Sequence, residues 1–282
     1  MKKITTDYYY ETYHGHHIQY LKIIYDYFSK HKNIVWFAGD SSLDNKYWID
    51  TASPALNGYE NIFFIPIMKN DLCYHVNKYL LNTNFVAINT AIEATTLADR
   101  ENKLLDQDIF IRDDILIVSI GGNDIALKPS FSTILHMTCL IYLNNVDTIK
   151  SGPDNIWGFG YFINMFKDQI KQYIEQLIVK TKPNKIIVCT IYFPDETTNG
   201  SWADKLFNFI GYNKDPVQLQ EIIKQIHIHA ISKIKIQGIE IVPFPMFKIL
   251  NGKNTKNYVQ RVEPSNLGGK KLAKKLTKHI IK

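Results

Sequence analysis

Short runs of apolar residues recur along the chain and constrain its fold more than any other feature. The clearest runs from Ile115 to Ile120 and stops at Gly121 and Gly122. Runs that are apolar at nearly every position, instead of every second one, are typical of parallel strands in a sheet covered on both faces. They predict an α/β protein with three layers, helices lying on both sides of a mainly parallel sheet. Comparable runs occupy residues 34–37, 85–88, 185–191 and 239–242.

The segments between these runs carry apolar residues at helical spacing, as Ile18, Leu21 and Ile24 do. Asp71 and Ser265 stand where they could cap helices. A chain of 282 residues can bury one large core, so we expect a single domain over residues 16–282, preceded by a mobile segment, residues 1–15. Predicted helices cover residues 18–28, 71–81, 95–105, 159–181, 216–236 and 268–282.

The net charge of +6 comes from the end of the chain. Residues 270–282 contain six lysines and no acidic residue, and the rest has equal numbers of basic and acidic residues. Nucleic-acid-binding proteins usually spread a basic stripe over a folded face, so we expect no nucleic-acid partner. Leu272, Ala273 and Leu276 alternate with the lysines, which predicts an amphipathic helix with a solvated lysine face. The alternative is a weak contact of this helix with an anionic membrane.

Targeting signals are not evident in the sequence. The first twenty residues lack the apolar segment of a secretory signal. The most apolar stretch, residues 134–146, is shorter than the about 20 residues that span a bilayer. Cys73, Cys139 and Cys189 lie far apart and are odd in number, which argues against a disulfide framework. We therefore expect an intracellular, cytoplasmic protein.

Polar residues follow two of the predicted strands where each strand ends. Gly39 allows a sharp turn, after which Ser41 would stand at a helix N-terminus, where backbone N–H groups stabilise negative charge. An Asp-Ser pair in this position is also ordinary helix capping. Asn123 places a side-chain amide after the central strand. Because working residues of such sheets lie beyond the carboxyl ends of the strands, Ser41 and Asn123 are expected at one edge.

These segments, in this order, resemble the SGNH hydrolases, also called GDSL esterases and lipases, over essentially the whole chain. Residues 39–41 match the family's first block, and residues 121–124 match its Gly-x-Asn-Asp block. The resemblance implies a flavodoxin-like sheet and ester hydrolysis with Ser41 as nucleophile. It also implies an oxyanion hole formed by the backbone N–H groups of Ser41 and Ala94 and the amide of Asn123. The supporting residues of these blocks are Gly39, Asp40, Asp44, Gly122 and Asp124.

Two blocks depart from the family pattern. The second has Ala91 and Ala94 in place of glycines, and the N–H of Ala94 remains a donor if its φ stays negative. The last block has Gln260 and Glu263 in place of aspartate and histidine. We therefore expect Glu263 to act as the base and Gln260 to hold it by a hydrogen bond. A carboxyl group starts roughly 3 kcal/mol weaker as a base than imidazole; burial would strengthen it and the adjacent Arg261 would weaken it.

Other polar and aromatic residues have two interpretations each. Asp44 and Asp124 either polarise the site or cap helices and brace loops. A histidine elsewhere in the chain, such as His136, is an alternative base. For each histidine, however, a structural position in the core or at the surface is favoured over a role as the base. Zinc binding by the His14–His17 segment is disfavoured, and we predict neither metal nor cofactor. Six aromatic residues either line a pocket or pack against the sheet: Tyr47, Trp48, Trp157, Tyr192, Phe193 and Trp202.

The leading hypothesis is a serine hydrolase that cleaves a carboxylic ester, an acyl or acetyl group on a lipid or carbohydrate. Its partner is then a small-molecule ester, and the sequence predicts no oligomeric state. The alternative is a catalytically inactive protein of the same fold that binds a ligand or a protein partner through the same cleft. It stays open because Ser41 and Asn123 are retained while the usual acid–base pair is not.

Overall fold

A computed structural model describes residues 3–11, 13–101, 114–154 and 156–282 of the chain. Its centre is a five-stranded parallel sheet in the order β4-β1-β5-β6-β7. This order is that of flavodoxin-like sheets, and it reverses between β1 and β5, where such folds place their ligands. The strands are β1 (Asn33–Gly39), β4 (Phe85–Asn89), β5 (Ile115–Ser119), β6 (Lys185–Thr190) and β7 (Glu240–Pro245).

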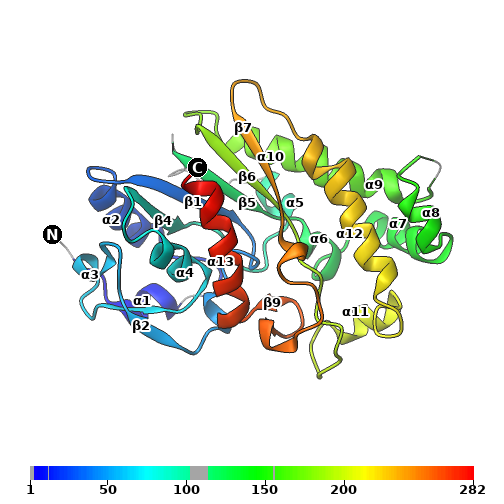
Figure 1. The fold of residues 1–282 in the computed structure, drawn as a ribbon, viewed down its shortest axis with the longest axis horizontal. Coiled ribbons are helices and arrows are strands. Elements are labelled where there is room, and N and C mark those ends of the chain that lie inside the picture. The colour runs from blue at the N-terminus through cyan, green and yellow to red at the C-terminus, as the bar shows by residue number, and fades with distance from the viewer. Residues whose placement is uncertain (1–2, 12, 102–113, 155) are drawn as a thin grey trace.

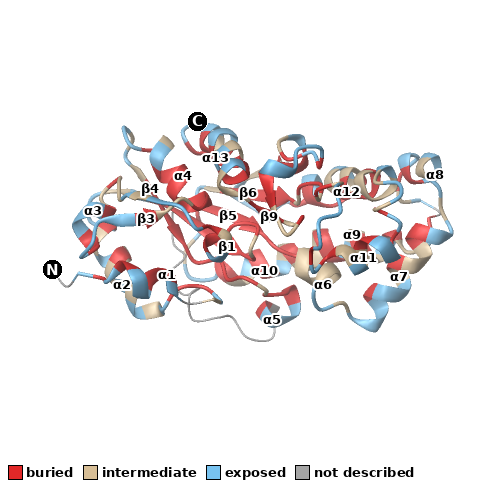
Figure 2. Ribbon diagram, turned by 90° about the horizontal axis from the view of Figure 1, so that it is seen from below, coloured by how far each residue is buried: buried red, intermediate tan, exposed pale blue. Residues whose placement is uncertain are grey.

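Helices cover both faces of the sheet, so the predicted three-layer α/β/α architecture is confirmed (Figure 1). Val35 and Phe37 of β1 face α4 (Leu72–Tyr79) and α13 (Asn266–Ile280), whereas Ile34 and Trp36 belong to the core on the other side. That second core includes side chains of α2 (Ile18–Phe28) and α10 (Ile170–Leu177). Burial on both faces explains why the strands are apolar throughout (Figure 2).

The remaining elements lie around these layers. Helices α7, α8, α9, α11 and α12 gather beyond one end of the sheet (Figure 1). The other helices are α1 (Thr6–Glu11), α3 (Tyr59–Ile62), α5 (Leu97–Glu101), α6 (Gly122–Ala126), α7 (Phe131–Tyr142), α8 (Val146–Lys150), α9 (Phe159–Asn164), α11 (Asp204–Phe209) and α12 (Val217–His229). Two short antiparallel pairs join β2 (Ala52–Pro54) to β3 (Ile67–Lys69) and β8 (Tyr258–Val259) to β9 (Glu263–Pro264).

Most predicted helices are present, with shifted ends. Asp71 and Ser265 cap α4 and α13, accepting hydrogen bonds from the backbone N–H groups of Tyr74 and Gly268. The helix predicted over 159–181 is α9 and α10 joined by a π-helical segment, Met165–Gln169. The one predicted over 216–236 ends at His229. The helix predicted over 95–105 appears as α5, and residues 102–105 lie outside the described residues.

Both ends of the chain pack against the body. Ile4 is buried, and its backbone N–H donates to the carbonyl of Ile62. The predicted amphipathic helix at the C-terminus is α13, which buries Leu272 and Leu276 on α4 and leaves Lys274 exposed. No helix in the described part of the chain combines the length and the apolar character needed to cross a membrane.

Candidate active site

The turn after β1 is built so that Ser41 stands free of the structural hydrogen bonds around it. Gly39 has φ of +135°, and a Cβ there would collide with the carbonyl oxygen of Ser119 on β5, so only glycine fits. Asp40 is buried, and its Oδ1 accepts a hydrogen bond from the Ser42 backbone N–H at 3.0 Å. The Ser42 hydroxyl lies 2.6 Å from both Asp40 Oδ1 and Ser119 Oγ. Asp40 therefore braces the turn, and Ser41 remains half-buried beside it.

The structure brings Glu263 to Ser41 from the far end of the sequence. Ser41 Oγ donates a hydrogen bond to Glu263 Oε1 at 3.1 Å. The Glu263 side chain is buried, and its Oε2 is without a hydrogen-bond partner among the described residues.

Burial raises the pKa of Glu263 to about 8. The hydrogen bond from Ser41 acts in the opposite direction, and the nearby carboxylates of Asp40, Glu93 and Asp44 raise the pKa further. Because a carboxylate with this pKa is at least as basic as an ordinary imidazole, burial removes the deficit expected from the reference values.

A short hairpin aims Glu263 and its neighbour Arg261 in different directions. Gln260 and Arg261 have φ of 49° and 66°, and the turn they form joins β8 to β9, with Val259 paired to Glu263. The buried Arg261 guanidinium donates to Asp204 Oδ1 at 2.7 Å. The Arg261 group that was expected to weaken Glu263 as a base is therefore paired elsewhere.

Gln260 contacts a neighbouring loop. Its side-chain Oε1 accepts a hydrogen bond from the backbone N–H of Trp202 at 3.3 Å, and its carbonyl accepts one from the Ser201 hydroxyl at 2.6 Å. No hydrogen bond joins Gln260 to Glu263 in the part of the chain that the structure describes. The structure thus pairs Gln260, the predicted orienting residue, with the loop at 201–202.

Asn45 is a site residue that sequence reasoning missed. It is fully buried, and its side-chain Nδ2 donates to the carbonyl of Pro264 at 2.8 Å, while its Oδ1 accepts from the backbone N–H of Leu72 at 2.9 Å. These bonds tie the loop after Ser41 to β9, which carries Glu263, and to the start of α4. Nothing in the sequence pattern separates this asparagine from a solvated loop residue.

A buried ion cluster lies close to the turn that carries Ser41. Lys46 Nζ lies 2.7 Å from Asp44 Oδ2 and 2.6 Å from Glu93 Oε1, and all three side chains are fully buried. Asn89 donates to Asp44 Oδ1 at 2.8 Å, and the backbone N–H of Gly15 donates to Glu93 Oε2 at 2.7 Å. Asp44 therefore braces loops, the second of its two predicted interpretations. Glu93, within the second block, received no predicted role.

The predicted oxyanion donors have different surroundings. The backbone N–H of Ser41 has no hydrogen-bond partner among the described residues. Asn123 Nδ2 donates to the carbonyl of Thr95 at 2.9 Å, which leaves its second N–H hydrogen available. Ala94 has φ of +58°, so the negative φ on which its role depended is absent.

Asp124 acts as a structural residue at the start of α5. Its Oδ2 accepts a hydrogen bond from the backbone N–H of Leu97 at 2.9 Å. Burial raises the pKa of Asp124 to about 6. The helix-capping interpretation of this aspartate is the one that the structure matches.

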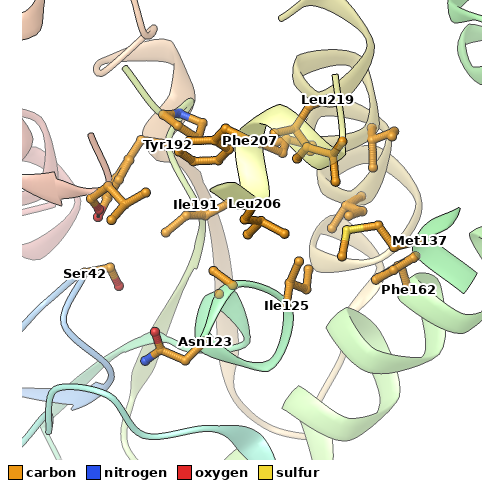
Figure 3. A pocket seen from close by; sticks show the side chains of 18 of the residues that line it. Ser42, Asn123, Ile125, Met137, Phe162, Ile191, Tyr192, Leu206, Phe207 and Leu219 are labelled. Atoms are coloured by element: carbon orange, nitrogen blue, oxygen red, sulfur yellow. Dashed lines mark hydrogen bonds between the residues drawn. The ribbon is translucent and has the colours of Figure 1, made fainter. Parts of the chain in front are cut away.

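A cavity of about 140 Å³ opens beside Ser41, Asn123 and Glu263. Figure 3 shows Ser42 and Asn123 at one end of it and Met137, Phe162 and Leu219 at the other. Gly122 contributes to the wall at the polar end. Of the six aromatic residues singled out in the sequence, Tyr192 and Trp202 line this cavity.

Within the described residues, the Ser41 hydroxyl is hydrogen-bonded to Glu263 and to no histidine. His14 Nδ1 lies 3.2 Å from the Glu93 carbonyl oxygen, His227 Nδ1 lies 2.7 Å from Thr190 Oγ1, and the ring of His136 stacks on Tyr161. Within the described ranges, no group of three or more His, Cys, Asp or Glu side chains could hold a metal ion.

Comparison with known proteins gives structural similarity only. No protein-family model matches the chain, and no curated protein matches it by sequence. It is similar to the solved structure of a lipase/acylhydrolase from Enterococcus faecalis, at 11% identity and a TM-score of 0.46 over 88% of this chain and 95% of the other. An acetylxylan esterase from Geobacillus stearothermophilus shows 14% identity and a TM-score of 0.47 over 88% and 94%. An extracellular lipase from Streptomyces rimosus shows 11% identity and a TM-score of 0.41 over 88% and 99%.

Proposed function

We propose that the chain hydrolyses carboxylic esters, with Ser41 as the nucleophile and Glu263 as the general base. The observation that carries this proposal is the 3.1 Å hydrogen bond from Ser41 Oγ to Glu263 Oε1 at the mouth of a cavity. Proton transfer needs a contact of this length, and the raised pKa of about 8 gives the carboxylate the necessary basicity.

The proposed reaction has two stages. Glu263 accepts the hydroxyl proton as Ser41 Oγ attacks the ester carbonyl, and the protonated Glu263 then gives that proton to the departing alcohol. In the second stage Glu263 takes a proton from water as the water oxygen attacks the acyl-enzyme carbonyl. Glu263 then gives that proton to Ser41 Oγ as the acyl–oxygen bond breaks, which releases the acid and restores free Ser41. In this scheme Glu263 serves both stages without a hydrogen bond to an aspartate.

The negative oxygen of each tetrahedral intermediate needs hydrogen-bond donors. The backbone N–H of Ser41, which has no partner within the described ranges, and the second N–H hydrogen of Asn123 fill this role in the proposal. Since Ala94 lies in the left-handed region, we leave its N–H out of the oxyanion hole. The proposed site therefore stabilises the intermediate with two donors.

The direct test combines turnover with covalent labelling of the purified chain. Hydrolysis of p-nitrophenyl butyrate should fall by about 10³-fold or more in Ser41→Ala. A fluorophosphonate probe should modify the native protein at residue 41, as peptide mass spectrometry can establish. Ser42→Ala is the matched control, because its hydroxyl contacts Asp40 and Ser119, and this variant should still be labelled at Ser41.

Equal rates for the native protein and Ser41→Ala, together with no labelling at residue 41, would contradict the proposal. That result would favour the alternative, a catalytically inactive protein that binds through the same cleft.

A further inference from the structure

The cavity beside Ser41 is polar only at its mouth. Beyond Asn123 and Glu263 its walls are side chains of α6, α7, α9, α11 and α12, among them Ile125, Met137 and Leu206. Thr190, a polar residue in the wall, is already hydrogen-bonded to His227. Figure 3 shows these apolar side chains extending away from Ser42 toward Leu219.

Such walls restrict what can occupy the cavity. A buried water needs two to four hydrogen-bond partners, and each hydroxyl group of a sugar needs a similar number. The walls far from Ser41 supply almost no hydrogen-bonding groups. A hydrocarbon chain gains free energy from each CH₂ that it buries there. The occupant is therefore an aliphatic or aromatic group.

The volume limits the length of that group. An apolar cavity of about 150 Å³ can bind benzene, which has six carbon atoms. The cavity here is of the same size, at about 140 Å³. The carbonyl carbon lies at Ser41, outside the apolar part of the cavity. An acyl chain that fills this part therefore has about six to eight carbons in all.

The acyl half of an ester suits this cavity better than the alcohol half. The alcohol must leave before water attacks the acyl-enzyme, and water must then reach the carbonyl carbon held at Ser41 and Asn123. An acyl chain anchored in the cavity keeps that carbon in place while the alcohol departs on the side of Ser41 and Asn123, which are both partly exposed.

We propose that this cavity binds the acyl chain of a medium-chain ester, of about six to eight carbons, which makes medium-chain acyl esters the preferred substrates. The inference rests on the proposed function, because it assigns the acyl group of the ester that Ser41 attacks.

The first experiment measures kcat/KM for p-nitrophenyl acetate, butyrate, hexanoate, octanoate and dodecanoate. The value should rise about three- to fourfold for each added CH₂ up to hexanoate or octanoate and then level or fall. Ethyl octanoate should be cleaved faster than octyl acetate. Two results would overturn this inference and leave the proposed function intact. One is Ser41-dependent hydrolysis that is fastest with p-nitrophenyl acetate, and the other is faster hydrolysis of octyl acetate than of ethyl octanoate.

The second experiment fills the far end of the cavity. Leu219→Trp should lower the ratio of kcat/KM for the octanoate ester to kcat/KM for the acetate ester by about tenfold or more, because only the long chain reaches Leu219. Val217→Trp is the matched control on the same helix, since Val217 is 46% exposed and does not line the cavity. Equal effects of Leu219→Trp on both esters would contradict the inference.

Binding without turnover separates the two proposals. Octanoate should bind Ser41→Ala in calorimetry, with a negative heat-capacity change, and acetate should bind far more weakly. Octanoate binding with no hydrolysis of any ester would support the cavity assignment and contradict the proposed function. No octanoate binding, in a protein that hydrolyses acetate, would contradict only the cavity assignment.

Discussion

Two glutamates, Glu93 and Glu263, are buried close to the turn that carries Ser41, and their partners differ. Glu93 accepts hydrogen bonds on both oxygens, from Lys46 Nζ at 2.6 Å and from the backbone N–H of Gly15 at 2.7 Å. Glu263 accepts one, from Ser41 Oγ at 3.1 Å, and its second oxygen has no partner among the described residues. The first carboxylate is held by a cation, and the second faces a neutral hydroxyl.

The two side chains are chemically identical, and their partners set their different properties. Burial lowers the pKa of Lys46, but the carboxylates of Asp44 and Glu93 outweigh burial and raise it, so Lys46 keeps its positive charge. Glu263 lacks such a cation, and burial raises its pKa to about 8. A fully paired carboxylate braces the fold, and a half-paired one can accept a proton from Ser41.

The largest expected effect is on turnover. Glu263→Gln should lower kcat/KM for p-nitrophenyl butyrate by about 10²- to 10⁴-fold, the usual contribution of a general base, because the amide cannot take the Ser41 proton. Glu221→Gln is the matched control, since Glu221 is equally buried, at 6% exposure, and contacts Lys224 and Gln225 instead. If the two variants retain equal activity, Glu263 is no base.

The paired glutamate should matter for stability. Lys46→Met leaves Asp44 and Glu93 buried without their cation, which should reduce the free energy of unfolding by about 3–5 kcal/mol. Urea unfolding at pH 7.5 measures this loss. At pH 5 the loss should shrink, because burial raises the pKa of Asp44 to about 7 and its neutral form needs no cation. A loss that is the same at both pH values would mean that packing, not charge, explains the effect.

The half-paired glutamate should affect stability with the opposite sign. The pKa of Glu263 is about 8 in the folded protein, against 4.5 in the unfolded chain. The stability that protonated Glu263 contributes to the folded state is therefore fully present below pH 4.5 and is lost as the pH rises through 8. Glu263→Gln has no carboxyl group to titrate, so it does not show this loss. The free energy of unfolding of the variant minus that of the native protein should therefore rise by about 2–4 kcal/mol between pH 5 and pH 9. A difference independent of pH would argue against the raised pKa.

The smallest effect concerns Gln260. Gln260→Met removes the acceptor for the Trp202 N–H and should lower the free energy of unfolding by about 1 kcal/mol, while kcat/KM and its pH dependence stay at native values. Steady-state kinetics across pH and urea unfolding measure both. A large loss of kcat/KM with a shifted pH profile would instead make Gln260 the residue that positions Glu263.

The sequence predicts the fold, and which distant residues lie close together, better than it predicts the hydrogen-bond partners of polar side chains. The apolar runs required a sheet covered on both faces, and the edge of that sheet carries Ser41 and Asn123, as parallel topology dictates. The contact between Ser41 and Glu263 was expected from the resemblance alone, because Glu263 stands where the last block of the SGNH hydrolases has its histidine.

Partners of polar residues could not be predicted in the same way. Asn45, Lys46 and Glu93 look like solvated loop residues in the sequence, and only the packed structure shows that they are buried. The direction of the Arg261 side chain depends on two consecutive residues in the left-handed conformation in the β8–β9 turn. Since neither residue is a glycine, the sequence does not indicate this conformation. The same holds for Ala94, whose positive φ is fixed by its surroundings.

The most direct test of the Ser41–Glu263 pair is the pH dependence of kcat/KM between pH 6 and pH 10, with the rate of Ser41→Ala subtracted. Since Glu263 must be ionised to accept the proton, and burial raises its pKa to about 8, kcat/KM should rise about tenfold per pH unit below 8 and reach a plateau above it. A profile that is already flat at pH 6, or one with its midpoint near the 6.5 of an ordinary histidine, would contradict the assignment of Glu263 as the base.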